Sequence, residues 1–370
     1  MAGCQVQGVG IYGAGGYGRA FYRAMTANGV TPAFFVDQFC QAPEVLGIPV
    51  LRIEQLADAD ATIYVSLALT PSPADPGSDI VATLNGAGIN NVRSFTESLH
   101  EFPEALEHII ALGYLWMRDG PKNTLDPNGI EQCRQLLSDD VSRDTLDRIV
   151  AFRQHPTAGN YVPPDGQTEY FPGDIDLFSR LDAIRFVDAG AYTGDTIGAL
   201  VEHCARINKA IDYSVSFEPD ADNYVQLLSE LSRAKAASPT ANFMALPMGL
   251  WSSNTVLHFA TGNGSSTAVS DSTGESADGT SLPVVTLDSV LPSAPPNFIK
   301  MDIEGAEREA LLGARHLIQR HSPVLAICVY HRPADLWELP LLIHRLNPNY
   351  RMHLRVHSHM GLSTVLYCVP

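Results

Sequence analysis

The sequence has little of what marks membrane, disulfide-rich or secreted proteins. No uncharged apolar stretch reaches the roughly 18 residues that a bilayer span needs. The six cysteines are scattered and no two form a CxxC pair, which fits reduced thiols in a cytoplasmic protein. No Lys or Arg precedes Arg19, and the early apolar residues are interleaved with glycine, so the N-terminal segment does not resemble a signal peptide.

Positive charge is also scarce. The chain has 41 acidic and 24 basic residues, which gives a formal net charge of −17. Because no basic run offsets this excess, nucleic acid and anionic membrane surfaces are poor partners for it. The 370 residues exceed the size of one domain, about 150 residues, so we expect two or three units. Nothing in the sequence specifies the oligomeric state.

The first segment, residues 1–100, alternates strand-like and helix-like patterns. Strand patterns cover residues 9–12, 33–37 and 62–66, and a glycine-rich turn follows the first of them. Such alternation predicts an α/β fold, a parallel sheet with helices on its faces. We therefore expect a small Rossmann-like domain here.

The second segment, residues 101–180, has a different character and is expected to be a helical connector and cap. Amphipathic helices are predicted at residues 104–118 and 130–153, followed by a Pro/Gly-rich stretch at residues 155–173. Three aromatic residues lie in this stretch: Tyr161, Tyr170 and Phe171. Anchoring of a loop on the core is the favoured interpretation, and capping of a neighbouring pocket is the alternative.

The third segment, residues 181–370, alternates again. The main strand patterns cover residues 185–189, 213–218, 243–250, 298–302, 324–330, 352–357 and 364–369, and a Gly/Ser-rich insertion covers residues 261–281. Residues 358–363 join the last two strands and are too few for a parallel crossover, so these strands must pair antiparallel. A mostly parallel sheet closed by an antiparallel hairpin favours a methyltransferase over an ordinary dinucleotide-binding fold.

A strand that ends in an acid, followed by a glycine-rich turn, opens the third segment. Such a turn lets the backbone approach a ligand at the carboxyl edge of a sheet, and the next helix offers N–H groups to an anion. Glu218 ends the second strand, where an acid can accept hydrogen bonds from both hydroxyls of a ribose. The candidate cofactor-binding residues are Asp188, Gly190, Ala191, Tyr192, Thr193, Gly194, Asp195, Thr196, Glu218, Pro219, Ala245 and Leu246.

Charged residues crowd the end of a later strand. Lys300, Asp302 and Glu304 lie in the run IKMDIEGAE, and His331 follows the next strand at the same edge. A histidine there could take a proton from a hydroxyl, because its pKa lies near neutrality. In the plainer interpretation Asp302 caps a helix and His331 is structural. Capping does not explain Lys300, so all four residues are catalytic candidates.

Together these runs resemble the FkbM family of methyltransferases over roughly residues 181–370. The matching elements are residues 186–196, Phe217-Glu218-Pro219, Gly264-Ser265-Ser266, Val285-Thr286-Leu287-Asp288, residues 299–307 and Val329-Tyr330-His331. The resemblance implies a class I methyltransferase fold, S-adenosylmethionine as donor, and a hydroxyl acceptor on a sugar, glycan or secondary metabolite. Residues 136–153 also resemble the connecting helices of longer members that carry an extra N-terminal domain.

By matching positions, Asp188, Gly190 and Gly194 would shape the donor site, and Glu218 would hold its ribose. Asp302 and Glu304 would sit beside the transferred methyl. Many members have Asn where this chain has Tyr192, which leaves the contact made at this position open.

The resemblance also implies a mechanism in which the protein aligns donor and acceptor for in-line transfer and excludes water. His331 or Asp302 would assist deprotonation of the acceptor. A divalent metal bound by Asp302 and Glu304 would lower the pKa of the hydroxyl instead, and the pattern leaves the need for a metal open.

A second candidate nucleotide site lies in the first segment. Gly13, Gly15 and Gly18 form a GxGxxG after a strand, Gly16 lies within it, and Asp37 follows about 20 residues further on. This supports a competing class, an NAD(P)-dependent oxidoreductase, although the segment is short for a full dinucleotide fold. The segment also resembles the small nucleotide-binding domain that precedes some bacterial sugar-modifying transferases. This resemblance leaves open a role in binding a nucleotide sugar, a role in recognising the acceptor, or a domain that kept the turn and binds nothing. A non-catalytic nucleotide-binding protein is the third alternative, which the intact acidic cluster disfavours.

Overall fold

The computed structural model describes residues 7–56, 60–68, 79–118, 125–259 and 280–370. The Gly264-Ser265-Ser266 element, and the Gly/Ser-rich insertion as far as residue 279, lie outside these ranges.

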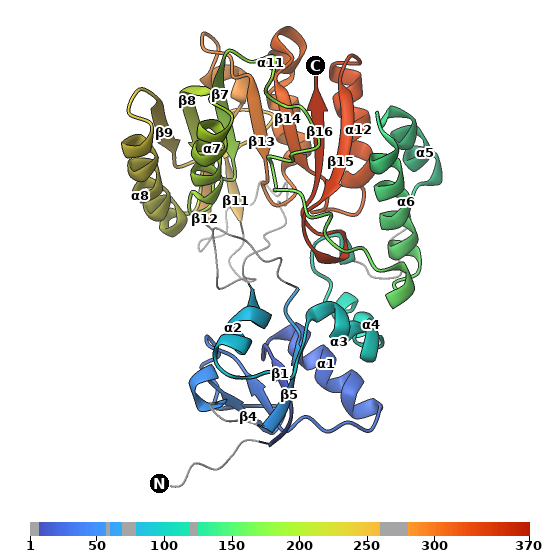
Figure 1. Ribbon diagram of the computed structural model, residues 1–370. Helices are drawn as coiled ribbons and strands as arrows, with labels where there is room; N and C mark the ends of the chain where they lie inside the picture. The colour runs from blue at the N-terminus through green and yellow to red at the C-terminus, as the bar shows by residue number, and fades with distance from the viewer. Residues whose placement is uncertain (1–6, 57–59, 69–78, 119–124, 260–279) are drawn as a thin grey trace. The chain divides into compact units, whose positions relative to one another are not determined.

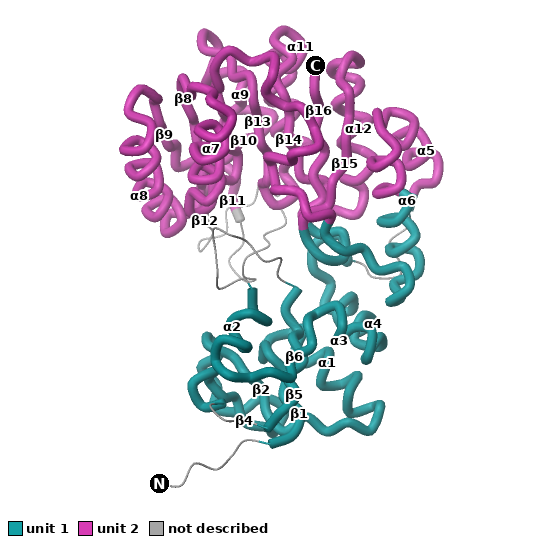
Figure 2. The backbone as a smooth tube through the Cα atoms, viewed as in Figure 1, with its two compact units in different colours: residues 1–125, 147–164, 358–362 teal, residues 126–146, 165–357, 363–370 magenta. Residues whose placement is uncertain are grey.

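The chain forms two compact units, each built from discontinuous segments (Figure 2). Unit 1 comprises residues 1–125, 147–164 and 358–362, and unit 2 comprises residues 126–146, 165–357 and 363–370.

Unit 1 is built on a six-stranded sheet with the strand order β3-β4-β2-β1-β5-β6. Its strands are β1 (Gln7–Tyr12), β2 (Phe34–Val36), β3 (Glu44–Val45), β4 (Ile48–Leu51), β5 (Asp60–Val65) and β6 (Val92–Arg93). Its helices include α1 (Gly16–Ala27), α2 (Ile80–Gly86), α3 (Phe95–Glu101) and α4 (Ala105–Ile110). Every neighbouring pair is parallel except β3 with β4, so this unit has a separate, mostly parallel sheet.

Unit 2 is built on a seven-stranded sheet with the order β15-β16-β14-β13-β7-β8-β9 (Figure 1). Its strands are β7 (Ala183–Ala189), β8 (Ala210–Phe217), β9 (Asn242–Leu246), β13 (Phe298–Met301), β14 (Val324–Cys328), β15 (Arg351–Val356) and β16 (Thr364–Val369). Pairing is parallel from β9 to β14, whereas β16 pairs antiparallel with both β14 and β15. This confirms the expected mostly parallel sheet with an antiparallel last strand.

The central strands of unit 2 are buried along their whole length, which explains their unbroken apolar sequences. Every residue of β13, β14 and β16 is buried, as expected for strands covered on both faces. The flanking helices are α7 (Asp195–Arg206), α8 (Ala221–Ala237), α9 (Leu287–Val290), α10 (Glu307–Gly313), α11 (Arg315–His321) and α12 (Asp335–Leu346). A small sheet of β10 (Gly249–Leu250), β11 (Thr255–Phe259) and β12 (Thr280–Val285) accompanies them.

The connector departs from the sequence prediction. Instead of one helix over residues 130–153, the chain forms α5 (Pro127–Leu136) and α6 (Asp140–Gln154). The break occurs because Asp139 accepts a hydrogen bond from the Ser142 N–H, as an N-cap does, while the Ser138 N–H donates to the Met352 carbonyl. Within the described ranges, no helix combines the length and apolar character needed to cross a membrane.

The helix predicted at residues 104–118 is also shorter than expected. It ends with α4, and a single 3-10 turn (Leu115–Met117) follows. Gly113, between these elements, has a φ of 72°, and Leu115, the first residue of the turn, has a φ of 51°. A right-handed helix cannot pass through left-handed residues, so the amphipathic pattern is interrupted there.

Candidate functional site

The turn after β7 brings three strand ends of unit 2 together. The N–H groups of Gly190 and Ala191 both donate to the Phe217 carbonyl at 3.0 Å. Gly190 has a φ of 78°, and a Cβ atom at this position would lie 1.8 Å from the Asp302 carbonyl oxygen. Only glycine fits this crossing, so the turn, the end of β8 and the residue after β13 form one edge.

Glu218 lies at this edge, as predicted. Its carboxylate accepts hydrogen bonds from the N–H of Tyr192 at 2.8 Å and the N–H of Asp220 at 2.9 Å. The side chain is 6% exposed, and burial raises its pKa above the usual value. A carboxylate has about four lone-pair positions, so it can still accept from the hydroxyls of a ligand.

The start of α7 carries the other predicted residues of this edge. Gly194 is the N-cap residue with a φ of 95°, and the Asp195 carboxylate accepts from the Thr196 N–H at 2.9 Å. This N–H is therefore occupied within the chain rather than offered to an anion. Tyr192 has a φ of 48° and is 58% exposed, so its ring lies open to solvent beside the turn.

The left-handed backbone at Tyr192 explains the residue common in the resembling family. Asn tolerates this conformation better than an aromatic residue does. Two further predicted cofactor-site residues lie beside this edge: the Leu246 carbonyl accepts from the Glu218 N–H, and the Ala245 carbonyl accepts from the Tyr224 hydroxyl. A hollow of about 790 Å³ beside α8 and β9 touches this set only at Ala245.

Lys300 and Asp188 form a buried ion pair behind the glycine turn. Their charged atoms lie 3.0 Å apart, and the side chains are 2% and 0% exposed. The Lys300 ammonium also donates to the Gly190 carbonyl at 2.6 Å. Burial opposes the charge on Lys300, but Asp188 and Asp302 outweigh it and raise the lysine pKa above its usual value. Both residues therefore fix the turn from inside rather than face a ligand.

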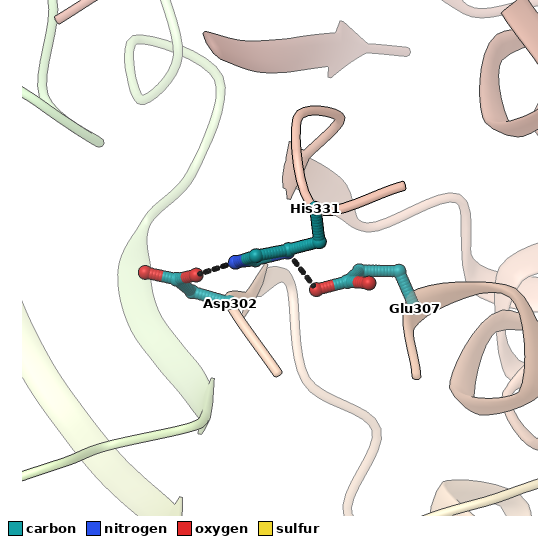
Figure 3. A group of neighbouring side chains, drawn as sticks. All are labelled: Asp302, Glu307 and His331. Carbon is teal, nitrogen blue, oxygen red and sulfur yellow. Dashed lines mark ion pairs between the residues drawn. The ribbon is translucent and has the colours of Figure 1, made fainter. Parts of the chain in front are cut away.

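His331 lies between two carboxylates (Figure 3). Its Nδ1 is 2.8 Å from Glu307 Oε1, and its Nε2 is 3.2 Å from Asp302 Oδ1 and 3.9 Å from Glu304 Oε2. The histidine is 2% exposed, Glu307 is 1% exposed and Asp302 is 27% exposed. The predicted catalytic residues Asp302, Glu304 and His331 are thus brought together, and Glu307 joins them.

The charges of this group shift the pKa values of His331 and Asp302 in opposite directions. Burial alone would lower the pKa of His331, but Glu307 and Asp302 raise it well above its ordinary value. Burial likewise opposes ionisation of Asp302, but His331 and Lys300 outweigh it and keep the pKa of Asp302 well below its usual range. The surroundings of the ring therefore favour the protonated imidazole and the ionised Asp302 beside it.

The ligand atoms of Asp302, Glu307 and His331 lie within 4.8 Å of one another, which raises the question of a metal. A metal-bound histidine must be neutral, whereas the two carboxylates favour its protonated form. The imidazolium already supplies the positive charge that a cation would bring. Both ring nitrogens of His331 already contact carboxylates, so a metal bound here would have to displace one of these contacts.

Sequence reasoning did not assign to the site two tyrosines that contact Asp302, although capping of a pocket was the alternative interpretation for one of them, Tyr170. The Tyr170 hydroxyl donates to Asp302 Oδ2 at 2.8 Å, and the Tyr330 hydroxyl lies 3.5 Å from Oδ1. Tyr170 is separated from Asp302 by 132 positions, in the Pro/Gly-rich stretch without periodicity. Its aromatic character in a linker-like segment was the available signal.

Unit 1 brings its own glycine turn and acid together. Gly13 has a φ of 99°, and a Cβ at Gly18 would lie 1.8 Å from the Gly13 carbonyl oxygen. The Asp37 carboxylate accepts from the Ala14 N–H at 2.9 Å, as Glu218 does from Tyr192 in unit 2. The N-cap residue of α1 is Gly15, which has no side chain that could cap the helix.

The strand order of unit 2, its antiparallel last strand and the acid after its second strand are features of a methyltransferase-like fold. The sequence comparison gives the family: residues 188–358 match the Methyltransferase FkbM domain, so this part of the chain is an FkbM methyltransferase domain. No curated protein sequence matches the chain.

The fold is similar to that of a solved structure, the methyltransferase FkbM from Methylobacillus flagellatus KT. The TM-score is 0.58 at 24% identity, over 98% of this chain and 90% of that one. A second structure, the CMeT domain of the citrinin polyketide synthase, gives a TM-score of 0.28 at 11% identity, over 74% of this chain and 67% of that one.

Proposed function

We propose that unit 2 is an S-adenosylmethionine-dependent O-methyltransferase that acts on a hydroxyl of a sugar, a glycan or a secondary metabolite. The observation that carries the proposal is Glu218, a nearly buried carboxylate at the end of β8 beside the glycine turn. Such an acid suits the two hydroxyls of a ribose. The match of residues 188–358 to the Methyltransferase FkbM domain supports methyl transfer as the reaction.

S-adenosylmethionine supplies a methyl group that is already activated by the sulfonium charge. The task of the protein is therefore alignment of the reactants and exclusion of water. Glu218 binds the ribose, and Asp302, held ionised by His331 and Lys300, faces the edge where the strands end. The buried Lys300–Asp188 pair keeps the glycine turn rigid.

His331 contributes to this proposal as a positioning residue. Because its pKa is raised well above the usual value, it is already protonated at neutral pH and is poorly suited to accept another proton. Glu307 contacts Nδ1 of the ring, and Asp302 contacts Nε2. The ring thereby orients the Asp302 carboxylate.

Isothermal titration of the purified protein with S-adenosylhomocysteine, NADH and NADP tests the proposal. We expect S-adenosylhomocysteine to bind in the micromolar range or tighter, with affinity reduced at least about 10-fold in Glu218→Ala. Binding of the nicotinamide cofactors alone would instead favour the oxidoreductase alternative, with the glycine turn of unit 1 as its site.

A further inference from the structure

Tyr192 occupies a backbone conformation that an aromatic residue rarely adopts. Its φ of 48° lies in the left-handed region, where the Cβ atom crowds the following carbonyl oxygen and where Gly, Asn and Asp are favoured. Strain of this kind is concentrated at active sites and ligand-binding sites. The backbone conformation therefore does not explain why a tyrosine stands at this position.

Packing within the protein does not explain the tyrosine either. The residue is 58% exposed, whereas its neighbour Ala191 is fully buried. Among the residues that the structure describes, the Tyr192 ring stacks on no other aromatic side chain, and its hydroxyl makes no hydrogen bond. Since neither the backbone nor the core accounts for the ring, a contact with a bound ligand is the physical reason that remains.

The backbone of Tyr192 is fixed beside the acid that is expected to hold a ribose. Its N–H donates to Glu218 Oε2 at 2.8 Å, and the N–H of Asp220 donates to Oε1 at 2.9 Å. These two bonds orient the carboxylate and tie the Tyr192 Cα atom next to it. A ring that starts from this atom reaches a nucleoside whose ribose is bound by Glu218. The ring and the carboxylate are thus placed to contact the same ligand.

We propose that the Tyr192 ring packs against the adenosine part of S-adenosylmethionine while Glu218 binds the ribose hydroxyls. This inference rests on the proposed function. An aromatic face stacks on a purine base, and such stacking strengthens nucleotide binding without hydrogen-bond readout. An Asn side chain would relieve the backbone strain but offers no such face. Tyr192 therefore lowers the stability of the free protein and raises its affinity for the donor.

Calorimetric titration tests this without an acceptor. S-adenosylmethionine and S-adenosylhomocysteine share the adenosine part and differ in the charge on sulfur, and both are titrated into the full-length protein. We expect Tyr192→Asn to lower both affinities by about 10-fold, or about 1.4 kcal/mol, which lies within the range for stacking of a base on an aromatic ring. Tyr192→Phe keeps the ring, so both affinities should stay within about 2-fold of the wild type.

An exposed tyrosine of unit 1 provides the matched control. Tyr114 is 51% exposed, and Tyr114→Asn should leave both affinities unchanged. Thermal unfolding of the ligand-free variants separates a lost contact from a folding defect, because Tyr192→Asn should melt at a higher temperature than the wild type while binding more weakly.

Three outcomes would overturn this inference and leave the proposed function standing. The first is unchanged affinity in Tyr192→Asn, and the second is an equally large loss in Tyr192→Phe, in which the ring is still present. The third is a loss for S-adenosylmethionine alone, which would place the ring on the sulfonium and not on the adenosine part. Failure of the wild type to bind either ligand would refute the proposed function itself.

Discussion

Replacing Lys300 by methionine tests whether the buried ion pair sets the stability of the site. The substitution keeps the length of the side chain but leaves Asp188, which is fully buried, without its partner at 3.0 Å. Removing one member of a buried pair costs about 3–5 kcal/mol. The Gly190 carbonyl also loses its hydrogen bond from the ammonium. We expect a loss in this range for the free energy of unfolding of unit 2.

The assay is urea-induced unfolding, monitored by hydrogen exchange of peptides from β7 and β13. These peptides report on unit 2 separately from unit 1. Burial already raises the pKa of Asp188, and removing Lys300 raises it further. Protonation then relieves the unpaired charge, so the destabilisation at pH 8 should shrink toward pH 5. Asp188→Asn combined with Lys300→Met should recover about 2 kcal/mol, because no charge is then buried.

Lys235→Met is the matched control. Its ammonium is exposed and bonds only the carbonyls of Pro239 and Ala241, so the loss should stay near about 1 kcal/mol. A loss in Lys300→Met as small as in this control, or one independent of pH, would refute the reasoning.

Three further substitutions test the edge around the turn. Gly190→Ala should destabilise unit 2 by more than about 2 kcal/mol in urea unfolding, because its Cβ would meet the Asp302 carbonyl, whereas Gly198→Ala in α7 has open space and should be neutral or stabilising. Tyr192→Asn should raise the melting temperature, because Asn relieves about 1 kcal/mol of strain in the left-handed backbone. A lower melting temperature in this variant would contradict the idea that Tyr192 is strained. Glu169→Gln should stabilise the protein by about 1–3 kcal/mol at pH 8 and by little at pH 5. The sign follows because burial raises the pKa of Glu169 in the folded protein to about 7, so its ionisation lowers the free energy of unfolding as the pH rises through that value. An equal effect at both pH values would contradict this reasoning.

The sequence predicts those parts of the fold that follow from local patterns. Buried strands such as β14 and β16 are continuous apolar runs, and the short link between β15 and β16 forces them to pair antiparallel. Glu218 could be placed because strand ends of a parallel sheet share one edge. The break between α5 and α6 escaped prediction, because it depends on Ser138 pairing with Met352, far along the chain.

The roles of the site residues were harder to predict than which residues form the site. Lys300 was proposed from the sequence as a catalytic residue, but the structure buries it against Asp188, whose position in another strand gives no local signal. His331 was found as a candidate, but its second carboxylate partner, Glu307, was not. Tyr170 lies in a stretch without periodicity and reaches the site only through a tertiary contact.

Both units contain the same hydrogen bond between an acid and a glycine turn, and the one in unit 1 provides a matched control for Glu218. In each, an acid after the second strand accepts from an N–H of the glycine turn: Asp37 from Ala14, and Glu218 from Tyr192. A ligand that binds unit 2 should therefore depend on Glu218 and not on Asp37.

Titration of S-adenosylhomocysteine into wild type, Glu218→Ala and Asp37→Ala is the most direct test of the account. We predict that affinity falls at least about 10-fold in Glu218→Ala, since a lost charged hydrogen bond costs about 1.5–3 kcal/mol, and is unchanged in Asp37→Ala. Loss of binding in Asp37→Ala with full binding in Glu218→Ala, or no binding to the wild type, would contradict the assignment of the donor site to unit 2.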